Sequence, residues 1–235
     1  MDARYLLSCV QMSLVCSLTA TALAVLAGAP VGLLLGRRRF PGRRALLVGA
    51  HTGMAVPTVV IGLVVYGLLT RAGPLGSLGM IYSAKAVILG EFALGFPIIV
   101  ALLSSAAAGL DPKLEMTART LGAGRLRLFW TVVREAKVGL IAATMSAFGR
   151  LCSELGIAMM VGGNMEYHTR TMTTAIAVET AGGEFAHALA LGLILLLIAL
   201  GVNVAAQIFR LPRLSGGRAE VRGQAAATRG AGDVL

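Results

Sequence analysis

The sequence predicts an all-α, polytopic membrane protein with about five transmembrane helices. Hydrophobic residues make up 57% of the 235 residues and charged residues only 14%, and the mean hydropathy is +0.81. Several apolar runs are long enough to cross a hydrocarbon core of about 30 Å, which takes roughly 20 helical residues. The charged residues lie mostly between these runs and in the C-terminal tail. This composition excludes an ordinary soluble domain, and it leaves no soluble basic face for nucleic acid.

The apolar runs define five predicted spans. The first run is too long for the core of a cleaved signal peptide and ends in three arginines, so we interpret it as a retained span. The second and third runs each contain glycines and a proline, which favour close packing of helix on helix. We therefore expect a helical bundle made of residues 6–35, 45–70, 84–105, 138–161 and 185–209.

A charged segment, residues 106–137, separates the third and fourth predicted spans and has the pattern of folded helices. Asp111 is a suitable cap for a helix that begins at the proline after it. Leu114, Ala118 and Leu121 then fall on one face of that helix. Because the segment must leave the bilayer, we expect it to be presented to a partner at the protein surface.

Gly122 and Gly124 end this first helix, and a second amphipathic helix follows them. The predicted apolar stripe of the second helix consists of Leu126, Phe129, Trp130 and Val133. The segment is therefore predicted to be a helix–Gly–helix unit.

The distribution of Lys and Arg predicts the orientation of the chain. In a five-span protein, the connection after the first span, the charged segment and the tail share one side, and together they hold sixteen Lys and Arg. The opposite side holds four. This asymmetry predicts an N-terminus outside the cytoplasmic membrane, with the charged segment and the C-terminus in the cytoplasm. Residues 1–214 form the predicted membrane domain, and residues 215–235 a disordered basic cytoplasmic tail.

Three charged residues lie inside predicted spans, where charge is costly and faces the bundle interior or a pathway. Arg150 and Glu154 are four residues apart and share one helical face, so we interpret them as a structural ion pair. The alternative is a role on a transport pathway. Glu91 lies near the outer end of its span, where we expect it to reach interfacial water.

Hydrogen-bond donors cluster after the fourth span. This stretch contains Asn164, Arg170, Thr171 and Thr173 close together, and directed N–H and O–H groups suit a tetrahedral oxyanion. An ordinary surface loop is the alternative interpretation. The three histidines lack metal-ligand spacing, so no metal site is predicted. The cysteines Cys9, Cys16 and Cys152 are predicted to be small buried hydrophobic residues.

The charged segment resembles the cytoplasmic signature of ABC importer permease subunits, which has the form EAAxxxG. Ala118, Gly122 and Ala123 match this signature, and Glu115 stands one residue before the usual position of the glutamate. The Leu-Pro that closes the family motif is replaced here by Arg-Glu. No GxxxxGK[ST] nucleotide-binding motif is present in the sequence. A nucleotide that powers transport would therefore sit on another chain.

A second stretch resembles the molybdate, sulfate and tungstate permeases of the same family. It runs from Phe148 through Ala175 and contains GR-x4-LG and GGN-x5-RTMT. The segment LDPKLEMTARTLGAG most resembles the tungstate-type branch.

The resemblance implies a type I ABC importer permease fold and a transport function without enzymatic activity on this chain. It implies a homodimer in the lipid bilayer of a bacterial or archaeal cytoplasmic membrane, two ATPase subunits that carry ATP and Mg, and an extracytoplasmic solute-binding protein. The implied cargo is an oxyanion, with tungstate first and molybdate or sulfate next. This chain itself needs no cofactor.

The resemblance also assigns two sets of residues. The first would contact the ATPase subunits and consists of Glu115, Ala118, Leu121, Gly122, Ala123 and Arg125. The second would line the pathway and consists of Arg150, Asn164, Arg170, Thr171 and Thr173. Two other functions stay open: an ion-coupled secondary transporter with Glu91, Arg150 and Glu154 as its relay, and a non-transporting scaffold.

Overall fold

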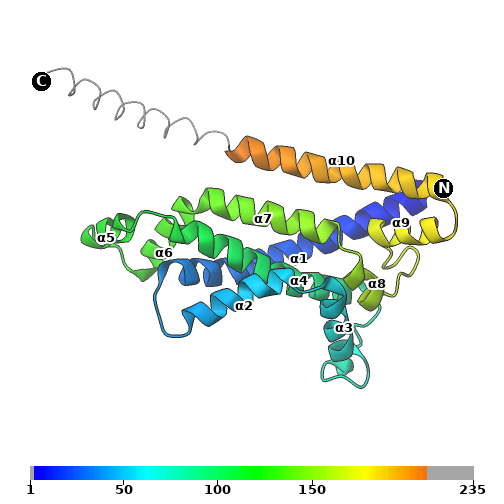
Figure 1. Cartoon of the computed structure of the whole chain (residues 1–235), viewed down its shortest axis with the longest axis horizontal. Helices are drawn as coiled ribbons and strands as arrows, with labels where there is room; N and C mark the ends of the chain where they lie inside the picture. The colour runs from blue at the N-terminus through cyan, green and yellow to red at the C-terminus, as the bar shows by residue number, and fades with distance from the viewer. Residues whose placement is uncertain (1–2, 211–235) are drawn as a thin grey trace, which may run out of the picture.

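Helices make up most of residues 3–210, the part of the chain that the computed structural model describes (Figure 1). A backbone in lipid must satisfy its own hydrogen bonds, and a helix does so within one segment. The described residues contain no β-strand. In chain order, the elements are α1 (Ala3–Arg37), α2 (Arg43–Ala55), α3 (Thr58–Leu69), the 3-10 turn η1 (Gly76–Leu78), α4 (Ala84–Ala108), α5 (Lys113–Thr120), α6 (Arg125–Glu135), α7 (Lys137–Cys152), α8 (Gly156–Gly162), α9 (Met172–Ala181) and α10 (Phe185–Arg210).

Three helices are long and apolar enough to cross a membrane without interruption: α1, α4 and α10. The second and fourth predicted spans are instead bent pairs. The pair α2–α3 bends by 102° and the pair α7–α8 by 60°, so up to five spans result if each pair is counted as one. The prediction of about five spans in an all-α membrane protein is confirmed, and the structure adds that the second and fourth spans are bent.

The two bends have different local causes. At the first bend, Pro57 has no N–H to continue the helix, and Val56 before it takes an extended conformation with φ −61° and ψ 130°. At the second bend no proline is present. The carboxylate of Glu154 accepts a hydrogen bond from the N–H of Ile157 at 3.2 Å, which satisfies a free donor in the first turn of α8.

Glycines let α1 and α4 pack closely along most of their length. A Cβ built on Gly28 would lie 3.1 Å from Ile99 Cγ2, and one on Gly36 would lie 2.6 Å from Ala107 Cβ. These glycines bring the two helix backbones together, as in other membrane bundles. Figure 1 shows α1 running through the bundle, with α5 and α6 at the end opposite the N-terminus.

Two predictions concern the C-terminal part of the chain. The predicted tail, residues 215–235, and the boundary at residue 214 lie outside the described residues. The helix α10 covers the fifth predicted span and packs against α7 and α9.

Candidate coupling surface and transport pathway

The helix α5 begins and ends as the sequence pattern predicts. The carboxylate of Asp111 accepts a hydrogen bond from the N–H of Lys113 at 2.8 Å. At the other end, Gly122 N–H donates to Arg119 O and Ala123 N–H to Ala118 O, both at 3.0 Å. This pair of bonds is a Schellman motif, which needs a left-handed residue at its turn. Gly122 supplies it with a φ of +77°.

The face of α6 that packs on the bundle differs from the predicted stripe. Val132 is buried in a cluster with residues of α1 and α4, and Leu128 is also buried, whereas Leu126 and Trp130 are exposed. Phe129 packs against that cluster and is partly buried. The helix α6 thus carries apolar residues on two faces, and the bundle covers only one of them.

The helices α5 and α6 therefore present a set of exposed apolar side chains, which we call the apolar patch. Its most exposed member is Leu121, whose exposed fraction is 79%. Apolar side chains exposed in this way on a segment between membrane spans are typical of an interaction site. The patch consists of Met116, Leu121, Leu126 and Trp130.

The other residues predicted to contact an ATPase have mixed environments. Glu115 does not extend freely into solvent, because its Oε1 forms an ion pair with Arg37 Nε at 2.8 Å. Ala118 and Ala123 are half-buried. Arg125 is exposed at the first position of α6.

The predicted ion pair within the fourth span is present in the structure. Arg150 Nη1 lies 2.9 Å from Glu154 Oε2. The exposed fraction is 45% for the Arg150 side chain and 1% for that of Glu154. Thr173 Oγ1 donates to the carbonyl of Glu154 at 2.7 Å and lies 2.9 Å from Thr171 Oγ1. Three of the five predicted pathway residues thus belong to one connected polar network.

The two remaining pathway candidates form a separate clamp at the N-terminal end of α1. Arg170 Nε donates to Asn164 Oδ1 at 3.1 Å, and Arg170 Nη1 donates to the hydroxyl of Tyr5 at 3.2 Å. The Tyr5 hydroxyl donates in turn to Glu179 Oε1 at 3.0 Å. Tyr5 and Glu179 were missed by the sequence reasoning, and no sequence signal connects residues so far apart. Through these hydrogen bonds, Arg170 holds the start of α1 against the chain around α9.

Glu91 lies deeper than predicted. Its exposed fraction is 2%, because the residue stands two turns inside α4 and faces the packed interior. Its Oε2 atom has no hydrogen-bond partner among the described residues, and the same holds for the hydroxyl of Thr21. The expectation that Glu91 reaches interfacial water is wrong.

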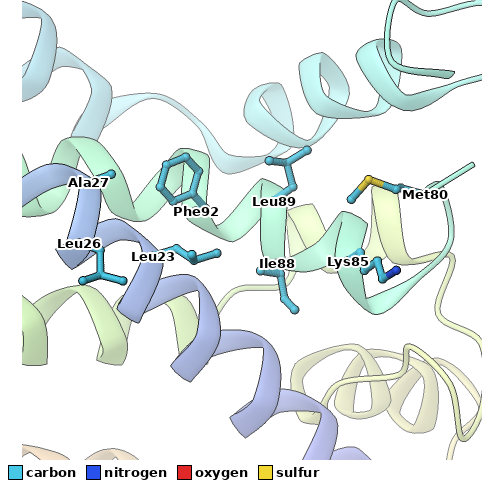
Figure 2. A pocket seen from close by; sticks show the side chains of 8 residues that line it. All are labelled: Leu23, Leu26, Ala27, Met80, Lys85, Ile88, Leu89 and Phe92. Carbon is cyan, nitrogen blue, oxygen red and sulfur yellow. The ribbon is translucent and has the colours of Figure 1, made fainter. Parts of the chain in front are cut away.

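A groove between α1 and α4 offers no polar path. It has a volume of about 670 Å³, and its lining side chains are apolar except for Lys85 near the start of α4 (Figure 2). Desolvating an oxyanion against such a surface is unfavourable. None of the predicted pathway residues lines this groove. Figure 2 shows that the labelled side chains come from α1, from α4 and from Met80 in the connection before α4.

The cysteines lie in the packed interior. Cys9, Cys16 and Cys152 are buried and unpaired, which confirms their predicted role as small hydrophobic residues. The described residues contain no group of three or more His, Cys, Asp or Glu side chains arranged to hold a metal ion.

Comparison with known proteins places these features in context. Residues 28–211 match the family described as "Binding-protein-dependent transport system inner membrane component". The tungstate uptake system permease protein TupB of Campylobacter jejuni is 41% identical over 164 residues, which cover 70% of this chain and 69% of the relative. A probable anion ABC transporter permease protein of Haloferax volcanii is 38% identical over 215 residues, covering 89% and 93%.

A solved structure has the same fold. A chain of the MetNI methionine ABC transporter, in inward facing conformations, superposes with a TM-score of 0.71 over 89% of this chain and 97% of that chain. The sequence identity is 18%, so this likeness concerns the fold alone.

Proposed function

Because the chain belongs to the family of binding-protein-dependent transport system inner membrane components, we propose that it is the permease subunit of an ABC importer for a tetrahedral oxyanion. Two copies would form the translocation pathway. ATP and Mg would be held by two ATPase subunits, and a solute-binding protein outside the membrane would deliver the anion. Multi-pass insertion in the cytoplasmic membrane agrees with the family and with the apolar helices.

The apolar patch on α5 and α6 is the observation that carries the coupling role. Leu121 stands beside the left-handed Gly122 at the tip of the segment and is exposed more than any other member of the patch. An ATPase subunit that covers the patch would remove this apolar surface from water, which stabilises docking. The Lys and Arg asymmetry supports a cytoplasmic location for the patch and an N-terminus outside.

The cargo is inferred from the relatives and from the polar network around Arg150. One relative is named as a tungstate permease and another as an anion permease. Within the network, the Arg150 side chain stays 45% exposed although Glu154 pairs with it. Guanidinium and hydroxyl donors bind tetrahedral oxyanions through charge-assisted hydrogen bonds. We place tungstate first, followed by molybdate and sulfate, which present the same tetrahedral oxygens.

Reconstitution tests this proposal directly. The permease would be assembled with its ATPase subunits in proteoliposomes, and ATP hydrolysis and uptake would be measured with the binding protein and each of the three anions. We expect the loaded binding protein to stimulate ATP hydrolysis and anion uptake together. Uptake that follows an imposed ion gradient and ignores ATP would instead support the secondary transporter. Failure of all three anions to stimulate the complex would remove the oxyanion assignment.

A further inference from the structure

Arg37, the last residue of α1, is held at three points by the chain around α5. Its Nε donates to Glu115 Oε1 of α5 at 2.8 Å. Its Nη1 donates to the carbonyl of Leu110 at 2.9 Å, and its Nη2 donates to the carbonyl of Asp111 at 3.4 Å. Both carbonyls lie in the short link between α4 and α5. The exposed fraction is 11% for the Arg37 side chain and 26% for that of Glu115, so the ion pair is partly shielded from water, and such shielding makes charge-assisted bonds stronger.

The helix that carries Arg37 is itself locked against α4. A Cβ on Gly36, the residue before Arg37, would lie 2.6 Å from both Ala107 Cβ and Ser104 O of α4. The two backbones are therefore in direct contact at this end of the bundle, and packed interiors resist small sliding movements. A group that is fixed to Arg37 moves together with α1 and α4.

We propose that Arg37 is a positioning residue that makes the coupling helix α5 move as one body with α1 and α4. This inference rests on the proposed function, in which an ATPase subunit docks on α5 and α6, and it adds that the docked subunit moves them. Leu114 also packs α5 on the bundle, but apolar packing is not directional. The planar fork of Arg37 holds one carboxylate and two carbonyls at once, which fixes both the position and the direction of α5.

Glu115 therefore has a different role from the one its sequence position suggests. The family signature implied a contact between this glutamate and the ATPase subunit. In the structure its carboxylate is turned to Arg37 within the same chain. We assign Glu115 to the internal transmission of movement and the apolar patch to docking.

Substitution of Arg37 tests the inference, with Arg39 as the matched control. Arg39 lines the same cavity of about 370 Å³, but its side chain is exposed and makes no hydrogen bond or ion pair with the described residues. In the complex with ATPase subunits, we expect Arg37→Gln to reduce stimulation of ATP hydrolysis by the loaded binding protein by about fivefold or more. The ATPase subunits should still copurify, because the apolar patch is unchanged. Arg37→Lys should recover part of the stimulation, and Arg39→Gln should behave as the unsubstituted protein.

A second measurement separates this inference from the proposed function. A nitroxide at Thr117→Cys on α5 reports the mobility of the coupling helix in the permease alone, by electron paramagnetic resonance. We expect Arg37→Gln to increase this mobility, and Arg39→Gln to leave it unchanged. Increased mobility in a protein whose ATPase is never stimulated would support the anchoring of α5 by Arg37 and reject the proposed function.

Two results would overturn the inference. The first is unchanged mobility and unchanged stimulation in both Arg37 variants of a complex that is otherwise stimulated. The second is loss of ATPase association in both variants at normal thermal stability, since Arg37 would then serve docking and not transmission. Arg37→Lys keeps the charge and most of the volume, so a folding failure of Arg37→Gln leaves the test intact.

Discussion

Gly122 is the residue on which the shape of the coupling segment depends. Its φ of +77° is a conformation that residues with a Cβ adopt only at a cost, and no atom lies within 4 Å of a Cβ built there. The requirement is thus one of backbone conformation and not of space. Gly124 differs, because its φ of −67° and ψ of 170° are open to any residue.

We predict that Gly122→Ala weakens ATPase association and coupled uptake, whereas Gly124→Ala does not. The left-handed conformation costs an alanine about 1–2 kcal/mol, which corresponds to a loss of about tenfold in the population of the bent segment. Copurification of the ATPase subunits and the initial rate of uptake would measure the effect. Equal behaviour of the two variants would show that the left-handed turn is not needed for docking.

At the scale of single residues, contacts between residues close in the sequence were predictable, and contacts between distant residues were not. The pair of Arg150 with Glu154 was predictable from their spacing of four, although Glu154 stands just beyond the end of α7. Arg37 pairs with Glu115 across 78 positions, and Arg170 with Tyr5 across 165, so nothing in the local pattern connects them. The sequence also does not show which apolar face of α6 is covered, since only the packed bundle determines it.

At the scale of elements, the two broken spans pack against each other. A Cβ on Gly62 of α3 would lie 3.2 Å from Met160 Sδ and 3.3 Å from Ile157 Cα of α8. Likewise, a Cβ on Gly156 of α8 would lie 3.1 Å from Val59 Cγ2 of α3. The segments after the two bends are therefore held by close contact between helix surfaces, and each bend is needed to bring its segment to the other.

We predict that Gly62→Val destabilises the protein and that Gly67→Val on the same helix does not. Overpacking at Gly62 should cost about 1–3 kcal/mol, because the nearest atoms include backbone of α8. No atom lies within 4 Å of a Cβ on Gly67, and the same substitution there controls for the change in helix propensity. Thermal unfolding in detergent would compare the two, and equal midpoints would contradict the close contact.

The sequence indicated the number and order of these elements but not their bends. The five apolar runs correspond to the three continuous helices and the two bent pairs. Hydropathy does not register a bend, since both halves of a bent span are apolar. Pro57 marks the first break locally, but the second break is associated with the buried carboxylate of Glu154, whose donor, the N–H of Ile157, becomes visible only in the structure.

At the scale of the whole molecule, the orientation in the membrane gives a clear prediction. Two exposed residues flank the span α4. Ser77 lies in the connection before α4, and Thr117 lies on α5, which follows α4. A membrane-impermeant maleimide should therefore label Ser77→Cys in intact cells and Thr117→Cys only after the membrane is opened. The native cysteines are buried, so they should contribute little background. Labelling with the opposite pattern would reverse the orientation derived from Lys and Arg.

The clamp between Tyr5 and Glu179 has a consequence for biosynthesis. Its two ends are separated by 174 positions, so the ribosome must make most of the protein before this hydrogen bond can form. At about 5–20 residues per second, this interval is on the order of 10–35 s. During that time the start of α1 must be shielded by lipid, the translocon or a chaperone. A chain that stops before Glu179 cannot form this hydrogen bond. Protease protection of stalled chains of increasing length should accordingly rise only after Glu179 has left the ribosome.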